Sequence, residues 1–243
     1  MEETFDTLST GGIRIVQPRK GYRFSLDSLI LPFFLQLKDD SSIVELGAGS
    51  GVVSMILAKR CPACRIASVE IQERLYTLLS RNLVLNGLED RIRAVHGDIR
   101  RMEEYFDPGA VEQVCSNPPF RKVRAGRINP DPEKAIARHE IEITLEDLVR
   151  AAAYLLKRHG RFSLIYLPER LTDLILTLRR MNLEPRRMQT IHSFSESQPV
   201  LLMMEAVKGA RPGLKMEAPF VIYQDKSKTY SREMEAIYGF QGE

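Results

Sequence analysis

The sequence lacks the features that mark membrane and secreted proteins. No apolar run approaches the roughly 20 residues that a membrane helix needs. The longest run, from Leu29 to Leu37, is interrupted by Pro32 and Gln36. The first residues are acidic and polar, without the basic-then-apolar order of a secretory signal. We therefore expect a globular protein of the cytoplasm.

Cysteine is also scarce, and three cysteines do not make a disulfide framework. Cys61 and Cys64 form a CxxC pair, but no second CxxC and no nearby pair of histidines completes a zinc site. We interpret Cys61 and Cys64 as two ordinary thiols, and we expect no metal site.

The chain has little excess charge of either sign, because its formal net charge is only +3. Overall charge therefore does not reveal a polyanionic partner, whereas the distribution of basic residues is more informative. These residues gather in three groups: Arg14, Arg19, Lys20 and Arg23; Arg121, Lys122, Arg124 and Arg127; and Arg179, Arg180, Arg186 and Arg187.

Apolar segments of strand length alternate with segments of helical period along the chain. Because parallel strands need crossover connections, this alternation predicts a parallel sheet with helices on both faces. Two late strands without a helix between them predict an antiparallel return at one edge. We expect an α/β fold with a seven-stranded, mostly parallel sheet and an antiparallel edge strand. The expected strands are 43–46, 65–70, 92–96, 111–116, 161–167, 186–192 and 200–207, and the expected helices are 51–60, 73–86, 145–156 and 168–181.

A glycine-rich turn follows the first expected strand of the sheet. Its pattern is ExGxGxG, formed by Glu45, Gly47, Gly49 and Gly51, and the third glycine comes one residue too early for a GxGxxG dinucleotide fingerprint. Glycines let a ligand approach the backbone closely. The carboxylate of Glu45 suits a ligand with an ammonium and a sulfonium group better than a pyrophosphate, which it would repel.

Single carboxylates follow the next two expected strands. Glu70 ends the strand 65–70, where it can accept hydrogen bonds from both ribose hydroxyls of a nucleoside. Asp98 follows the strand 92–96, where it can accept the amine of an adenine in the cofactor. Taken alone, Glu70 could be a surface acid and Asp98 a helix N-cap. The order of glycine turn, Glu70 and Asp98 favours a nucleoside-containing cofactor.

The motif Asn117-Pro118-Pro119-Phe120 follows the fourth expected strand and predicts the reaction class. Its target is a conjugated NH2 group, whose delocalised lone pair is a poor nucleophile. The Asn117 side-chain oxygen and the Pro118 carbonyl can each accept one N–H and aim the lone pair, so positioning does most of the catalysis. The prolines keep these acceptors extended, and Phe120 offers a face on which an extracted base can stack.

Together these motifs resemble class I methyltransferases of the N6-adenine type, specifically the bacterial tRNA (adenine-N6)-methyltransferases that modify a valine tRNA. The segment Lys20 to Leu31 is similar to the family's segment before the glycine turn. The resemblance implies a Rossmann-like class I methyltransferase fold, a tRNA substrate and S-adenosyl-L-methionine as cofactor, with S-adenosyl-L-homocysteine as product. It also implies that Phe24 and Asp27 help close the methionine end of the cofactor pocket. Asp27 is equally suited to cap the apolar helix that follows it.

The length of 243 residues suits one substantial α/β core with small extensions. We expect this methyltransferase core to span residues 41–209. Residues 1–40 would form an N-terminal extension that contributes to the cofactor pocket. Residues 210–243 would form a C-terminal tail, in which the apolar segment beginning at Phe220 is either an additional strand or a packing arm.

RNA is the expected substrate because DNA adenine methyltransferases usually carry a large target-recognition domain, for which this core leaves no room. An unpaired RNA loop offers bases without the cost of opening a duplex. The alternatives are methylation of a protein glutamine, whose carboxamide poses the same chemical problem, and methylation of the N2 amine of a guanine in rRNA. A non-enzymatic alternative is an RNA-binding, methyltransferase-like module.

The basic run Arg121, Lys122, Arg124 and Arg127 stands beside the catalytic motif, where it could hold RNA phosphates. Replacing Lys122, Arg124 and Arg127 by alanine should weaken RNA binding and flatten its dependence on salt concentration, because fewer phosphate contacts release fewer counterions. A binding titration at several salt concentrations measures both effects. Unchanged binding would remove this run from the RNA site.

Overall fold

A computed structural model describes residues 3–19, 23–118 and 143–242 of the chain. None of the helices in these residues is long and apolar enough to cross a membrane. The strands are β1 Glu3–Thr7, β2 Arg14–Pro18, β3 Ser42–Leu46, β4 Arg65–Glu70, β5 Ile92–His96, β6 Val111–Ser116, β7 Leu156–Tyr166, β8 Leu183–His192, β9 Pro199–Lys208, β10 Lys215–Met216 and β11 Phe220–Val221. The α-helices are α1 Leu26–Phe34, α2 Val52–Arg60, α3 Glu73–Asn86, α5 Leu145–Leu155, α6 Leu171–Arg180 and α7 Arg232–Gly239, and the 3-10 helices are η1 Thr10–Gly12, η2 Ile99–Glu104 and η3 Pro168–Arg170.

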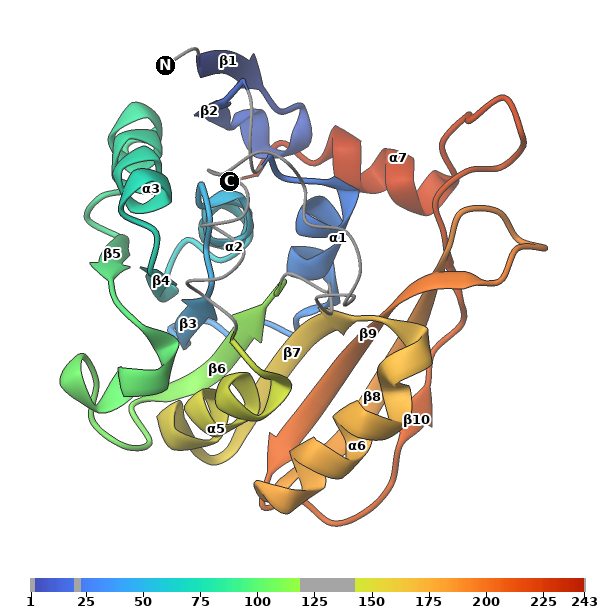
Figure 1. Ribbon diagram of the computed structural model, residues 1–243. Coiled ribbons are helices and arrows are strands. Elements are labelled where there is room, and N and C mark those ends of the chain that lie inside the picture. Colours follow the sequence, from blue (N-terminus) through green and yellow to red (C-terminus); the bar gives the residue numbers. More distant parts are fainter. Residues whose placement is uncertain (1–2, 20–22, 119–142, 243) are drawn as a thin grey trace, which may run out of the picture.

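The first strand of the central sheet along the chain, β3, lies inside the sheet and not at its edge. Its main strands lie in the order β8-β9-β7-β6-β3-β4-β5, so that the chain leaves β3 towards one edge through β4 and β5 and then returns to β6 on the other side of β3 (Figure 1). The pairs β3–β4, β4–β5, β3–β6 and β6–β7 are parallel. The connections after β3 and β6 therefore diverge, and such a divergence opens a crevice at the carboxyl ends of these strands.

The predicted α/β class is confirmed, and one detail of the sheet differs from expectation. The antiparallel strand β9 does not lie at the edge but between β7 and β8, and it pairs antiparallel with both. After β7, helix α6 leads the chain to β8, which leaves the place next to β7 vacant. The chain then turns back as β9, pairs with β8 as a hairpin and occupies that place. Two short strands, β10 and β11, add further parallel pairs to β8.

Helices pack on both faces of the sheet because successive strand residues point to opposite sides. On β3, Ile43 belongs to the hydrophobic cluster that includes α1, α2 and α7, whereas Val44 and Leu46 belong to the cluster under α5 and α6. Each of these three side chains is at most 1% exposed. The strand that precedes the glycine turn is therefore held from both sides.

The N-terminal hairpin of β1 and β2 is tied to the core through one buried side chain. Asn82, in α3, accepts a hydrogen bond from the Val16 backbone N–H at 2.7 Å and donates to the carbonyl oxygens of Val16 and Ser50, each at 3.0 Å. The same amide thus joins β2, α3 and the glycine turn. The sequence analysis predicted no strand in this segment.

The C-terminal segment returns across α1. Ile222 and Phe220 are buried, and Phe220 begins the short strand β11, so this apolar segment is both a strand and a packing arm. Helix α7 then lies beside α1 (Figure 1). After α7, the Phe240 ring meets Phe33 of α1 edge-on with centroids 5.4 Å apart, and its carbonyl accepts a hydrogen bond from Gly11.

Cys61 and Cys64 are a correction to the sequence analysis, because the structure joins them in a disulfide instead of leaving two ordinary thiols. The turn between α2 and β4 places their Cα atoms 5.3 Å apart, within the range that a disulfide spans. The backbone N–H of Cys64 also donates to the carbonyl of Cys61. CxxC spacing alone does not reveal whether a turn brings the two sulfur atoms together.

Met234 of α7 is 0% exposed and packs in the cluster that contains α1 and α2. Met234→Ala should lower the free energy of unfolding by about 2–5 kcal/mol, because the truncation leaves a cavity in a close-packed core. Thermal or urea denaturation measures the loss. The exposed neighbour Glu235 provides the matched control, since Glu235→Ala should change little. Equal stability of both variants would show that α7 is not docked on the core.

Candidate active site

The glycine turn connects β3 to α2 and is anchored on the neighbouring strand. The backbone N–H groups of Gly47 and Ala48 both donate to the carbonyl of Val69 at 2.9 Å. Gly47 has φ of 76°, and apart from its chain neighbours no atom of the described residues lies within 4 Å of the position that a Cβ would take there, so a ligand can approach its backbone. At Gly51 a Cβ would lie 2.4 Å from Leu79 Cδ1, so this glycine permits close packing on α3.

Glu45 is buried at the end of β3, behind the glycine turn. One of its oxygens accepts hydrogen bonds from the backbone N–H of Ser54, at 3.0 Å, and from the Ser54 hydroxyl. The Ser68 hydroxyl donates in turn to Ser54 Oγ at 2.6 Å. Burial raises the pKa of Glu45 to about 8, although the bonds from Ser54 oppose this shift. A cationic group bound nearby would offset this desolvation.

Glu70 ends β4 on the other side of the same turn. Its Oε2 accepts from the Gly49 N–H and its Oε1 accepts from the Gln72 N–H, both at 2.8 Å. The side chain therefore holds the glycine turn while each oxygen retains further acceptor capacity. Burial raises the pKa of this carboxyl as well. Two buried carboxyls beside the turn suit cationic or hydroxyl donors better than an anionic ligand, because a bound cation would favour their ionised forms.

Asp98 follows β5 and caps the 3-10 helix η2. Its Oδ1 accepts from the Arg100 backbone N–H at 2.9 Å, and both oxygens accept from the Arg100 guanidinium. Arg100 accordingly lowers the pKa of Asp98. The structure thus shows the capping geometry that the sequence offered as one interpretation of this residue. A carboxylate has about four lone-pair positions, and the four contacts from Arg100 use them, so an amine bound here would have to replace part of the Arg100 side-chain contacts.

Asn117 follows β6, directly beside the end of β3. The Ser116 hydroxyl donates to the Leu46 carbonyl at 2.8 Å and so joins the two strand ends. The Asn117 Nδ2 donates to Asp27 Oδ2 at 3.0 Å and to Ser28 Oγ at 3.1 Å. Its Oδ1 is buried and has no hydrogen-bond partner among the described residues. An unpaired buried acceptor is costly, and its presence marks the place where a donor fits.

The other members of the catalytic motif are described only in part. Pro118 is half-buried next to Asn117. The remaining predicted residues of the motif and the basic run lie outside the described residues: Pro119, Phe120, Arg121, Lys122, Arg124 and Arg127.

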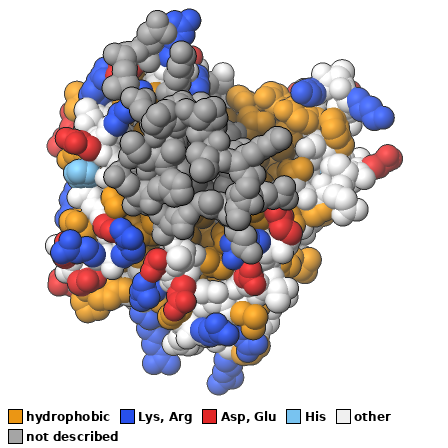
Figure 2. All heavy atoms as spheres, in the orientation of Figure 1, with side chains coloured by type: hydrophobic (Ala, Val, Ile, Leu, Met, Phe, Trp, Pro, Cys, Tyr) orange, Lys and Arg blue, Asp and Glu red, His pale blue; other side chains and the backbone are white. Residues whose placement is uncertain are grey.

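Two hollows are lined by residues at the start of α1. One is a crevice of about 10 Å³, room for a single water, and its lining includes Phe24, Ser28, Glu45 and Asn117 along with the glycine turn. The other is an open cleft of about 330 Å³ between the start of α1, the ends of β8 and β9, and Ile222. Hydrophobic side chains gather on the upper right of the same face in Figure 2. Asp27 lines the open cleft while its carboxylate contacts Asn117.

The sequence analysis missed the small hydroxyl side chains behind the motif residues. Ser28 contacts Asn117, and Ser54 with Ser68 supports Glu45. All three are buried. Ser28 directly follows Asp27, so its place in the first turn of the apolar helix was a usable signal. Ser54 and Ser68 carry no such signal, because only the packing of α2 on β4 brings them together.

The chain is similar to known methyltransferases. Residues 26–170 match the model of the family described as the methyltransferase small domain. The tRNA1(Val) (adenine(37)-N6)-methyltransferase of Porphyromonas gingivalis is 30% identical over 164 residues, which cover 67% of this chain and 64% of that protein. The Aeromonas hydrophila protein of the same name is 27% identical over 161 residues, covering 66% of this chain and 65% of that protein. The match thus spans less than two thirds of these relatives' length.

Solved structures show the same fold. A protein described as a predicted O-methyltransferase from Agrobacterium tumefaciens matches with a TM-score of 0.73 and 20% sequence identity, over 89% of this chain and 97% of that chain. Geranyl diphosphate C-methyltransferase from Streptomyces coelicolor matches with a TM-score of 0.56 and 14% identity, over 75% of this chain and 80% of that chain. At these identities the likeness establishes the Rossmann-like methyltransferase fold alone.

The burial of Glu45 predicts a dependence of stability on pH. In the unfolded chain this carboxyl ionises near its ordinary pKa of 4.5, whereas in the folded ligand-free protein it stays protonated up to about pH 8. Between these values the folded state holds one proton more, so its contribution to the unfolding free energy falls by about 1.4 kcal/mol per pH unit as pH rises. The Glu45→Gln variant has no ionisable group at this position, so its unfolding free energy should lack this decrease with rising pH.

Urea denaturation of both proteins between about pH 5 and 8 measures the difference, which isolates Glu45 from other titrating groups. The variant should become increasingly stable relative to the native protein as pH rises. Parallel stability curves would show that Glu45 is ionised in the folded state throughout this range.

Proposed function

Since this chain belongs to the methyltransferase small domain family, we propose that it is an S-adenosylmethionine-dependent enzyme that methylates the N6 amine of an adenine in tRNA. The observation that carries the proposal is the buried Oδ1 of Asn117 beside the glycine turn, which has no hydrogen-bond partner in the part of the chain that the structure describes. The names of the curated relatives support adenine in tRNA over a protein glutamine or a guanine in rRNA.

The residues around the glycine turn fit the cofactor. The space beside Gly47, which no described residue fills, admits a ligand to the backbone, while Gly49 is held by Glu70 and Gly51 packs on α3. We assign Glu70 to the ribose hydroxyls, because its buried carboxylate retains acceptor capacity, and Asp98 to the adenine amine. Glu45 and Phe24 belong to the methionine end, where a bound ammonium group would favour the ionised form of Glu45 and so offset the effect of its burial. When bound, S-adenosylmethionine supplies an electrophilic methyl group.

The protein's contribution to the reaction is the placement of the target amine. Asn117 Oδ1 accepts one N–H of the adenine amine, and the Pro118 carbonyl accepts the other. Two acceptors turn the planar amine towards a pyramidal geometry and direct its lone pair at the methyl group. S-adenosylmethionine held by the glycine turn, Glu45 and Glu70 would supply the methyl group, while Asn117 Oδ1 and the Pro118 carbonyl hold the two N–H groups, one of which would lose its proton to water. Phe120 would offer a stacking face for the base.

An RNA substrate also fits the positions of the basic residues in the sequence. Arg121, Lys122, Arg124 and Arg127 follow the catalytic motif directly, so phosphates beside the target nucleotide would meet them. By contrast, Arg14 and Arg23 make contacts within the fold. The Arg14 guanidinium donates to the Leu85 carbonyl, and its backbone N–H donates to the Asn86 side chain. Arg23 forms an ion pair with Asp6.

Transfer of labelled methyl from S-adenosylmethionine to unmodified bulk tRNA, followed by nucleoside analysis, tests the proposal. N6-methyladenosine is the expected product. Label in protein alone would favour methylation of glutamine, and label in N2-methylguanosine would favour the guanine reaction. Cofactor binding without transfer to any substrate would favour an RNA-binding module.

Asn117→Ala should reduce turnover by at least about a hundredfold, since it removes an acceptor made for the reacting amine. Cofactor affinity, measured by calorimetry, should remain within about twofold because the glycine turn, Glu45 and Glu70 are intact. Gln189→Ala is a suitable control, since Gln189 lies on β8 outside the site and its side chain donates to the Ala218 carbonyl. Full activity of the Asn117 variant would exclude the proposed role of this residue.

A further inference from the structure

The two ends of the Asn117 amide are chemically opposite, and its neighbours decide which end faces which way. The oxygen only accepts hydrogen bonds and the nitrogen only donates them. An ionised carboxylate only accepts, so the end that meets Asp27 must be the nitrogen. The contacts agree: Nδ2 lies 3.0 Å from Asp27 Oδ2 and 3.1 Å from Ser28 Oγ. Both N–H groups of the amide are therefore used inside the protein.

Asp27 and Ser28 are themselves held firmly. They lie in the first turn of α1, where the Ser25 hydroxyl donates to Asp27 Oδ1 and the Ser28 backbone N–H donates to the Ser25 carbonyl at 3.0 Å. The next residues, Leu29 and Ile30, are buried in the core under α1. The Asp27 carboxylate does not cap its own helix through a side-chain bond, because the N-cap Ser25 has none and Asp27 points to Asn117.

The oxygen at the other end of the amide has no hydrogen-bond partner among the described residues, although it is buried. Asn117 lines the crevice together with Glu45 and the glycine turn. If the amide turned over, Nδ2 would face this crevice and Oδ1 would face the Asp27 carboxylate. Two acceptors in contact repel each other, so the turned state is strongly disfavoured.

We infer that Asp27 and Ser28 are positioning residues that lock the Asn117 amide with its oxygen towards the substrate, and so make the site select a base that presents N–H donors over one that presents a keto oxygen. The inference rests on the proposed function for its substrate, an adenine. Hypoxanthine differs from adenine in carrying a keto oxygen where adenine carries its amine. That oxygen would meet the Asn117 oxygen, and two acceptors repel each other, whereas a turned amide would donate an N–H to it.

The orientation itself is testable without any substrate. In nitrogen–proton NMR spectra of the folded protein, the side-chain amide signals of Asn117 are identified by their loss in Asn117→Ala. In the native protein both amide protons should exchange slowly with water, because one is donated to the half-buried Asp27 carboxylate and the other to the buried Ser28 hydroxyl. Asp27→Ala should shift these signals and speed their exchange by about tenfold or more. Unchanged signals in that variant would overturn the inference, whatever the reaction proves to be.

The effect on selectivity is measured with two short RNAs that differ only in adenine or hypoxanthine at the target position. Asp27→Ala should lower kcat on the adenine RNA by about tenfold to a hundredfold, with KM and cofactor affinity within about twofold. The preference for binding the adenine RNA over the hypoxanthine RNA should fall by about tenfold. In the Asn117→Ala background, Asp27→Ala should have no further effect on kcat or on this preference.

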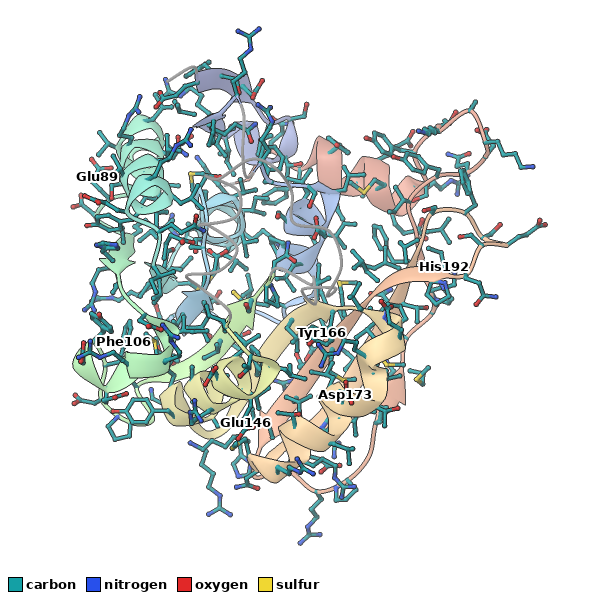
Figure 3. The ribbon with its side chains drawn as sticks, in the orientation of Figure 1. Glu89, Phe106, Glu146, Tyr166, Asp173 and His192 are labelled. Atoms are coloured by element: carbon teal, nitrogen blue, oxygen red, sulfur yellow. A yellow bond between two sulfur atoms is a disulfide. The ribbon has the colours of Figure 1, made fainter. Side chains whose placement is uncertain are left out.

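Asp173→Ala is the matched control, because Asp173 is also an acid in the first turn of a helix, α6, where it is labelled in Figure 3. It pairs with Arg170 and should leave kcat and selectivity unchanged. Ser28→Ala should produce a smaller change in the same direction as Asp27→Ala, since one of the two anchors remains.

The outcomes separate this inference from the proposed function. Native protein that methylates adenine, together with an Asp27→Ala variant of native kcat and selectivity, would refute the lock and leave the function standing. Native protein that transfers no methyl to adenine would refute the function, and the NMR result would then decide the orientation by itself.

Discussion

The pairing of β3 with β6 joins the two halves of the site, and at the strand ends the Ser116 hydroxyl donates to the carbonyl of Leu46. Leu46 is the last residue of β3 and Ser116 is the last residue of β6, and the chain diverges in opposite directions beyond them. The glycine turn and Asn117 therefore start from neighbouring strand ends, although Leu46 and Ser116 are 70 positions apart in the sequence. Every other feature of the site depends on this neighbourhood, because the cofactor and the target amine must meet within bonding distance.

The hydrogen-bond acceptors of the site are held in place by the fold before any ligand binds. Glu45 and Glu70 are buried on either side of the glycine turn, and both hold backbone N–H groups of the loop or of the following helix. Burial raises the pKa of both carboxyls, so a bound cation that favours their ionised forms would offset the cost of their burial. Asn117 Oδ1 is likewise an acceptor, and no described residue donates to it. The site is thus built to receive a ligand rich in donors and positive charge, which is the character of the proposed cofactor and of an aromatic amine.

Segments remote from the motifs keep these groups in place. Asn82 of α3 ties the N-terminal hairpin and Ser50 of the glycine turn together, and α7 with Phe240 covers α1, which presents Asp27 and Ser28 to Asn117. The two ends of the chain meet at the hydrogen bond between Gly11 and Phe240. Terminal segments that carry no recognisable motif are therefore part of the structure that supports the site.

The sequence by itself determined the α/β class, the bounds of β4, β5, β6 and α3, and the residue types at the strand ends, because local period, glycine and the Asn-Pro-Pro motif are properties of neighbouring residues. It did not determine the internal place of β9, the disulfide of Cys61 with Cys64, or the packing of α7. Only the tertiary structure decided which way the Asn117 amide faces. That orientation depends on Asp27, 90 residues away, and contacts at such separations arise from the packing of whole elements, which no local pattern encodes.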